Sequence, residues 1–267
     1  ESIIRFSDSV SGVGFITYAQ NDGGSDFMRF GTASTERMRI DSSGNVGIGV
    51  TPSTGWVASS DFRTLQIGSG LAIWGRGSGD HERLGLTANL YHDGSTWKHL
   101  VTGRVTSYEQ NDGKHIFKYH ASQSAGTSVT LSTAMTIDTA GNVGIGTDDT
   151  YSRKFAVEGT GDLMLLRSTN SGAGGAQLDL MHDSSSAADN DSIGIINFTT
   201  DDRQYASIKG VAHSHSSGHG LLQFGVRQNT STYNHTAMTI DENGNVGIGT
   251  TSPAHRLHIE GDTNNLA

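Results

Sequence analysis

The stretch Met38-Arg-Ile-Asp-Ser-Ser-Gly-Asn-Val-Gly-Ile-Gly49 decides the fold class, because it places two short alternating segments around a turn. Apolar side chains stand two residues apart in Met38–Ile40 and again in Val46–Ile48, which is the period of a β-strand. Between them, an aspartate can accept hydrogen bonds from the backbone that follows it, and Gly or Asn can adopt a positive φ. The stretch is therefore predicted to form a β-hairpin with one apolar face.

The hairpin motif returns at residues 135–146 and 238–249, so that its copies are about 100 residues apart. Each copy is followed by a short alternating piece, namely Leu65-Gln-Ile67, Phe155-Ala-Val157 and Leu257-His-Ile259. We therefore divide the chain into the end of one repeat (1–49), two complete repeats (50–146 and 147–249) and the start of another (250–267). Because it opens with Glu1, we interpret it as a segment of a longer repetitive polypeptide.

Glycine alternates with apolar residues in the second arm of each hairpin, which costs backbone entropy and leaves nothing to pack. A strand tolerates this where another backbone approaches closely, and an isolated hairpin is only marginally stable in water. We therefore expect three chains to meet around an axis; the alternative is an ordinary surface hairpin on a monomeric β domain. The residues expected to pack at the trimer axis are Met38, Ile40, Val46, Ile48, Met135, Ile137, Val143, Ile145, Met238, Ile240, Val246 and Ile248. The glycines expected at the close approach are Gly47, Gly49, Gly144, Gly146, Gly247 and Gly249.

The sequence between the motifs predicts further short strands, with turn residues every 8–12 positions, as in a β-sandwich or a barrel-like unit. No segment has the pattern of a helix of ten or more residues. The fold class expected is all-β, with repeated domains of about 100 residues in series that are joined by intertwined β-hairpin motifs of the associated chains.

Composition excludes several classes of protein. The chain has 18 basic and 27 acidic residues, a net charge of −9 and no basic cluster, which argues against a nucleic-acid partner. No apolar run is long enough for a transmembrane helix, so membrane insertion is not expected. The absence of cysteine excludes disulfides, thiolate metal sites and cysteine nucleophiles. Only 34% of the residues are hydrophobic, which predicts a thin core unless other chains contribute.

The repeated string Met-x-Ile-Asp-x-x-Gly-Asn-Val-Gly-Ile-Gly-Thr resembles the repeats of bacteriophage tail fibres. The third copy matches best, because Thr250-Thr-Ser-Pro253 and Leu257-His-Ile-Glu-Gly261 follow it; the second copy has Asp148-Asp149 where Ser-Pro is expected. The resemblance implies an elongated homotrimeric fibre in the extracellular part of the virion tail, attached to other phage tail proteins. Its role would be to space and present a tip that binds a host glycan or receptor. Such repeats often precede a C-terminal intramolecular chaperone domain, whose sequence is not recognisable here.

One tract has the appearance of a metal site: Val211-Ala-His213-Ser-His215-Ser-Ser-Gly-His219. If His213 and His215 faced a three-fold axis, three chains would supply six imidazoles, a set that suits a divalent transition metal. Some phage fibres that the chain resembles hold iron with such His-x-His pairs. The alternative is a solvated hairpin tip rich in Ser, Gly and His. No other cofactor is expected.

Two further functions compete with a structural role. Trp74 and Trp97 are candidates for glycan contact, although aromatic residues in a thin β core more often serve packing. The acidic residues allow a polysaccharide-degrading tailspike with paired carboxylates, but Asp41, Asp138 and Asp241 all occupy hairpin corners. We therefore expect no enzyme. The function expected is that of a structural shaft segment of a phage tail fibre. A receptor- or glycan-binding module and a cellular surface filament remain as alternatives.

Overall fold

The computed structural model describes residues 2–7, 14–20, 26–53, 56, 62–78, 81–169, 172, 175–183, 188–200, 203–227 and 235–261. Within these residues every named element is a β-strand, which confirms the all-β fold class. No helix in this described part is long and apolar enough to cross a membrane. The chain divides into two compact units, residues 1–165 and 166–267, and each is described by itself.

The described residues of the first unit form fifteen strands. They are β1 (Ser2–Phe6), β2 (Gly14–Ala19), β3 (Phe27–Thr32), β4 (Thr35–Asp41), β5 (Val46–Ile48), β6 (Phe62–Ile67), β7 (Leu71–Ser78), β8 (His81–Ala88), β9 (Leu90–His92), β10 (Trp97–His99), β11 (Gly103–Asn111), β12 (Lys114–Gln123), β13 (Ser132–Ile137), β14 (Val143–Ile145) and β15 (Phe155–Val157).

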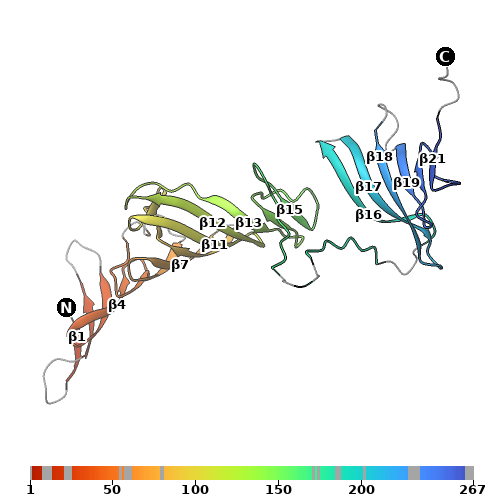
Figure 1. Ribbon diagram of the computed structural model, residues 1–267. Coiled ribbons are helices and arrows are strands. Elements are labelled where there is room, and N and C mark those ends of the chain that lie inside the picture. Colours follow the sequence, from red (N-terminus) through yellow and green to blue (C-terminus); the bar gives the residue numbers. More distant parts are fainter. Residues whose placement is uncertain are drawn as a thin grey trace. The chain divides into compact units, whose positions relative to one another are not determined.

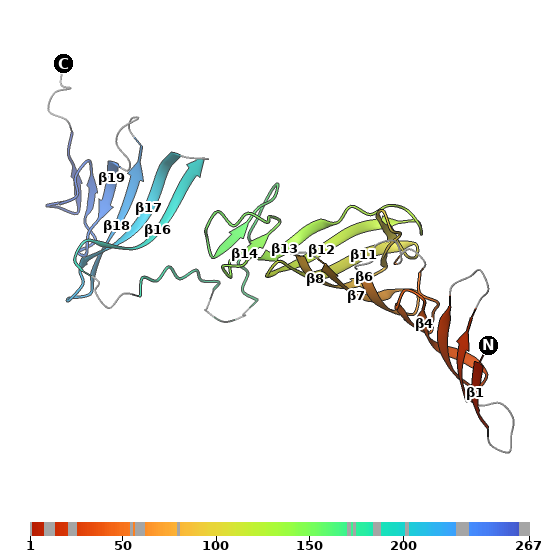
Figure 2. The ribbon, with the colours of Figure 1, turned by 180° about the vertical axis from the view of Figure 1, so that it is seen from behind.

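Thirteen of these strands form one open sheet whose spatial order follows the chain, while β9 and β10 form a separate hairpin. Figure 2 labels β6, β7, β8, β11 and β12, which are hydrogen-bonded neighbours in this order. The sequence predicted a sandwich or barrel-like unit. The sheet is instead open, and a small two-stranded layer covers part of one face.

The second unit contains β16 (Asp191–Thr200), β17 (Arg203–Ser214), β18 (His219–Val226), β19 (His235–Ile240), β20 (Val246–Ile248) and β21 (Leu257–Ile259). These six strands form a single sheet, again in chain order (Figure 1). The first five are successively antiparallel, and β21 lies parallel to β20.

Each repeated motif builds three strands rather than two. The predicted hairpins are present as β4–β5, β13–β14 and β19–β20. In each copy the second arm also pairs, in parallel, with the short alternating piece downstream: β5 with β6, β14 with β15 and β20 with β21. The motif therefore extends its sheet beyond the hairpin. In every copy this pairing joins residues on both sides of a repeat boundary, drawn at 49/50, 146/147 and 249/250.

The main apolar core of the first unit lies on one face of its sheet, beneath the β9–β10 hairpin. Trp56, Phe62, Ala72 and Trp74 form one buried cluster, against which Tyr91 and Trp97 pack. Leu90, Val105 and Val129 form a second cluster, which also contacts Trp97. We call this covered side of the sheet the back face. Its core is small, as the low hydrophobic fraction predicts.

Candidate functional site: an exposed apolar sheet face

The side of the first sheet opposite the back face, here called the front face, carries an unbroken row of apolar residues. Residues directly opposite each other on paired strands point to the same side of a sheet. The registers therefore align one such residue from every strand of the thirteen-stranded sheet except β1. The row, which we call the apolar ladder, consists of Tyr18, Met28, Ile40, Val46, Leu65, Ile73, Leu86, Tyr108, Phe117, Met135, Ile145 and Val157.

The ladder is substantially open to solvent in the single chain. Six of its members are exposed by 37–45%: Tyr18, Met28, Ile73, Leu86, Phe117 and Ile145. A second row runs beside it through Ile4, Ile16, Phe30, Met38, Ile48, Ile67 and Leu71. Large contiguous apolar surfaces of this kind mark sites of association.

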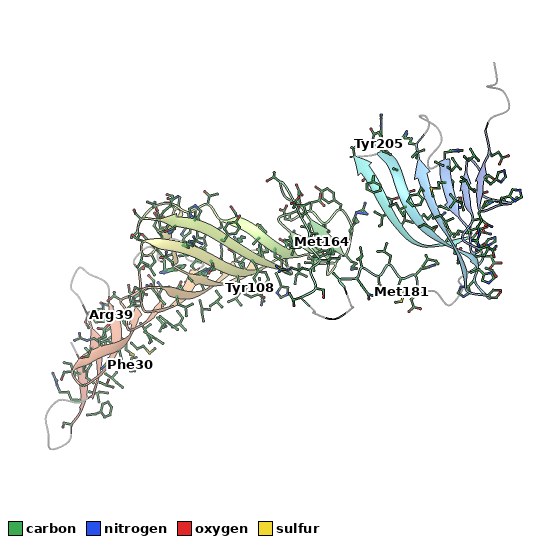
Figure 3. The ribbon with its side chains drawn as sticks, in the orientation of Figure 1. Phe30, Arg39, Tyr108, Met164, Met181 and Tyr205 are labelled. Carbon is green, nitrogen blue, oxygen red and sulfur yellow. The ribbon has the colours of Figure 1, made fainter. Side chains whose placement is uncertain are left out.

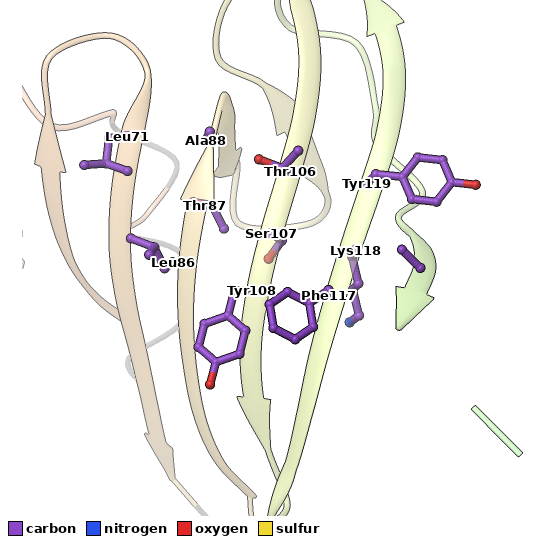
Figure 4. Close-up of a pocket in the computed structure, with 11 residues that line it drawn as sticks. Leu71, Leu86, Thr87, Ala88, Thr106, Ser107, Tyr108, Phe117, Lys118 and Tyr119 are labelled. Atoms are coloured by element: carbon purple, nitrogen blue, oxygen red, sulfur yellow. The ribbon is translucent and has the colours of Figure 1, made fainter. Parts of the chain in front are cut away.

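A hollow of about 480 Å³ interrupts the front face over β8, β11 and β12. It arises because Ala88 and Thr106, which lie opposite each other, continue the second row with short side chains. Larger residues border it, among them Tyr108, Phe117 and Tyr119. In Figure 4 the rings of Tyr108 and Phe117 lie next to each other, and their centroids are 5.0 Å apart. The hollow is therefore apolar and bordered by aromatic rings.

The second unit repeats this arrangement. One apolar residue from each of its six strands stands in register: Ile196, Ile208, Phe224, Met238, Ile248 and Ile259. Ile196, Ile248 and Ile259 are exposed, and Phe198, Leu222 and Val226 add further exposed apolar surface to the sheet. We use the term apolar ladder for this row as well.

The twelve residues predicted to pack at a trimer axis all lie on these two apolar faces. In each motif the registers place the methionine opposite the second hairpin isoleucine, as in Met135↔Ile145, and the first isoleucine opposite the valine, as in Ile137↔Val143. The shared face is thus a property of the fold. Packing around an axis stays a prediction.

A fixed turn holds each hairpin in register. In the second copy the Asp138 Oδ1 atom accepts hydrogen bonds from the amides of Ala140 and Asn142, each 2.9 Å long, and its Oδ2 atom accepts one from the Asn142 side chain at 3.0 Å. Asp41 and Asp241 make the corresponding bonds in the other copies. The aspartates that could have suggested a glycosidase therefore have a structural role.

The hydrogen bonds of this turn favour the ionised carboxylate. Those from the backbone and side chain of Asn142 hold the pKa of Asp138 below its ordinary value. For Asp241, burial acts to raise the pKa, but hydrogen bonds from Asn245 and Asn243 and the nearby Arg256 guanidinium bring it below the ordinary value. The turn is therefore most stable when its aspartate is charged.

Contacts and backbone angles within a single chain explain why the motif has glycine at these positions. A Cβ on Gly144 would lie 2.5 Å from the carbonyl oxygen of Thr147, and one on Gly247 would lie 2.6 Å from that of Thr250, because the chain folds back after the second arm. Gly47 meets the Val50 carbonyl in the same way. The last glycines, Gly49, Gly146 and Gly249, have φ values of 67°, 73° and 77°, which side-chain-bearing residues rarely adopt. Approach of neighbouring chains is not needed to explain these glycines, and it stays a prediction.

The prediction that Trp74 forms a glycan-stacking surface is wrong. Its side chain is 1% exposed on the back face, 5.6 Å from the ring of Phe62 and 5.1 Å from that of Trp97, measured between centroids. Trp97 is half-buried and packs edge-on against Trp56 and Phe62. Both indoles therefore belong to the core.

The predicted histidine site does not assemble within one chain. His213, near the end of β17, is exposed, and its Nδ1 atom lies 3.0 Å from the Glu242 carboxylate. His215 lies in the following turn, where its backbone amide donates to Asp189. In the part of the chain that the structure describes, no three His, Asp or Glu side chains gather as a ligand set. A site shared between chains stays a prediction.

The back face holds two polar clusters that the sequence analysis missed. Glu109 is 1% exposed and accepts hydrogen bonds from Arg83 at 2.9 Å and Lys118 at 2.8 Å, which joins β8, β11 and β12. His99 is fully buried, with its Nε2 atom 3.2 Å from the Nδ1 atom of His120. Burial and the neighbouring His120 lower the pKa of His99. Both clusters join residues distant in sequence, so no local pattern indicated them.

No protein-family model matches the chain, and no curated protein is similar to it at a significant level.

Proposed function

We propose that this chain is a structural shaft segment of a phage tail fibre, and that three copies associate with their apolar ladders turned toward a common axis. The proposal rests on the apolar ladder of the first sheet. Each of twelve successive strands of that sheet contributes one apolar residue to it. A solvent-exposed face of this extent is unfavourable in an isolated chain, and association of like copies would remove it from water.

The distribution of residues between the two faces supports the same arrangement. The back face has its own cover and its own buried core, so it needs no partner in its central part. Among the residues that the structure describes, the front face has neither a cover nor a buried core. Complete burial of a Leu, Ile, Phe or Met side chain is worth about 1.5–3 kcal/mol, so even partial burial along a ladder yields a large driving force for association.

The proposed role is mechanical. A sheet that grows strand by strand along the chain, with the same three-stranded motif in each repeat, is suited to spacing a distal receptor-binding part from the virion. Contacts with the host glycan or receptor would then belong to other parts of the fibre. The phage assignment itself rests on the resemblance of the repeated motif to tail-fibre repeats.

The native mass of the chain tests the proposal most directly. Light scattering should give the mass of three chains, and an unheated detergent gel should retain a slowly migrating species. Leu86→Asp places a charge on the ladder and should shift the mass toward one chain. Ala125→Asp is the matched control, because Ala125 lies at an exposed turn and hydrogen-bonds to Thr102 through its backbone amide, and it should leave the mass unchanged. A monomeric unsubstituted chain would refute the proposal.

The aromatic hollow favours a second candidate, a glycan-binding module. Tyr108, Phe117 and Tyr119 border it, and aromatic rings are suited to contacts with the apolar faces of sugars. A monomeric chain would leave this hollow accessible. In that case saturable binding to host polysaccharide should be lost in Tyr119→Ala.

A further inference from the structure

Between β15 and the second sheet the chain exposes an unusual number of large apolar side chains. Leu163, Met164, Leu165 and Leu166 follow one another, and Leu165 is 81% exposed. Met181, further along, is also 81% exposed. Figure 3 shows Met164 and Met181 on this extended part of the chain. Four consecutive apolar residues are typical of a strand that is covered on both faces.

The first complete repeat, residues 50–146, shows how such a segment folds when it is paired with neighbouring strands. There Gly68-Ser-Gly70 is followed by four apolar residues, Leu71–Trp74, and then by Arg76. The later segment has the same order, with Gly159-Thr-Gly161, the four apolar residues 163–166 and Arg167. The earlier segment forms β7, which pairs with β6 on one side and β8 on the other. Residues 163–167 belong to no strand.

The edge of β15 offers a position for this strand that corresponds to the position of β7 beside β6. β15 corresponds to β6, because each pairs in parallel with the second arm of its motif. β6 has β7 on its other side, whereas β15 is the last strand of its sheet in the described part of the chain. An unpaired edge strand presents free backbone donors and acceptors to any strand that can add to it.

Two acidic residues disfavour pairing of residues 163–167 with β15 of the same chain. If residues 163–167 folded back on β15 as β7 does on β6, Val157 would lie opposite Leu163. Glu158 and Asp162 would then face each other across the turn, and like charges directly opposite are destabilising. The first repeat has no acidic residue in its turn, Gly68-Ser-Gly70. A segment that arrives from another chain forms no such turn.

We propose that residues 163–167 of one copy add as a β-strand to the β15 edge of a neighbouring copy, so that the subunits of the fibre exchange strands. This inference rests on the proposed function, because it requires more than one copy. It assigns to the exposed apolar segment a specific partner and a specific edge. The exchange would join the subunits through backbone hydrogen bonds as well as through the apolar ladders.

Because the chain has no cysteine, engineered disulfides test the exchange cleanly. Antiparallel pairing would place Ala156 opposite Met164, off the apolar ladder, so Ala156→Cys with Met164→Cys should form a disulfide between chains. Asn197→Cys with Ser207→Cys is the control, since these residues pair within one chain and should give only an intrachain bond. Each single-cysteine variant should give no cross-link. The readout is a denaturing gel without reductant.

The outcomes separate the two proposals. Dimer and trimer bands from the Ala156/Met164 pair support strand exchange. A trimer by light scattering with only intrachain disulfides, or with none, overturns the exchange and leaves the shaft proposal intact. A monomer by light scattering overturns both. Asp162→Asn should increase the intrachain fraction, because it removes the charge repulsion in the turn; an unchanged fraction would contradict that explanation.

Discussion

Gly85 and Trp74 form a coupled pair on which the back-face core depends. The indole of Trp74 lies directly over Gly85, where a Cβ would overlap its Cε2, Cζ2 and Nε1 atoms. Gly85→Ala should therefore force the indole out of a closely packed cluster, at a cost of about 1–3 kcal/mol. In a unit of this size that corresponds to a fall of roughly 2–12 °C in the unfolding temperature.

The glycine should become unnecessary once the indole is gone. Trp74→Ala alone should cost about 3–5 kcal/mol, because it leaves a cavity among buried rings. In that background Gly85→Ala should be neutral, or stabilising by about 0.4–1 kcal/mol, since it restricts the unfolded chain. The two substitutions should thus show a coupling of about 1–4 kcal/mol.

Urea unfolding followed by far-UV circular dichroism measures this cycle without relying on tryptophan fluorescence. Gly75→Ala is the matched control, because Gly75 lies on the same hairpin and its added Cβ would contact nothing within 4 Å. If Gly85→Ala were equally costly with and without Trp74, the indole would not be the reason for the glycine. The placement of Trp74 in the core would then be wrong.

Three further predictions concern pH and the motif turn. Because the pKa of His99 is lowered by burial and by His120, the folded state binds protons less readily than the unfolded state, and stability should decline below about pH 6.5. His99→Leu should reduce the difference in urea midpoint between pH 7 and pH 5; an unaltered difference would contradict this. Because hydrogen bonds lower the pKa of Asp138, its contribution should be present above about pH 3.9 and disappear as the pH falls through its folded-state pKa. Asp138→Asn should therefore lower the unfolding temperature at pH 7 and progressively less toward acid, and a deficit that is constant with pH would argue against the carboxylate. Gly144→Ala should lower the unfolding temperature, since its Cβ would lie 2.5 Å from a carbonyl oxygen of the following turn; calorimetry showing no change would indicate that the turn can relax.

The local part of this fold was predictable from sequence. Period-two spacing identified the arms of each hairpin, and the Asp-x-x-Gly-Asn corner identified the turn between them. The same spacing placed Met38, Ile40, Val46 and Ile48 on one face, as the register confirms. These features depend on neighbours within about ten residues, so a local pattern contains them.

The parallel third strand of the motif was recognised only as a recurrent piece of sequence. Parallel pairing normally uses a crossover of a dozen or more residues, often with a helix. Here residues 146–154 alone connect β14 to β15, and a loop of that length gives no signal of parallel geometry. The need for glycine at position 144 was not predictable from sequence either, because it depends on how the following loop returns over the strand.

The faces of the sheet could not be assigned from alternation alone. A period of two assigns alternate residues of a strand to opposite faces, but it does not indicate which face is covered by other parts of the chain. Trp74 and Ile73 are neighbours on β7, and only the tertiary structure shows that the first lies in the core and the second on the exposed ladder. Likewise, Glu109 and Arg83 lie 26 residues apart, beyond any local pattern.

The chain-order arrangement of the strands has a consequence for how the protein is made and how its length can change. Almost every strand finds its partner in the strand synthesised just before it, so the sheet can form progressively as the chain leaves the ribosome, with little entropy lost to loop closure. A duplicated or deleted repeat would alter only the pairings at its two junctions and leave all other registers as they are. Genetic recombination between repeats could therefore lengthen or shorten the protein without redesign of its fold.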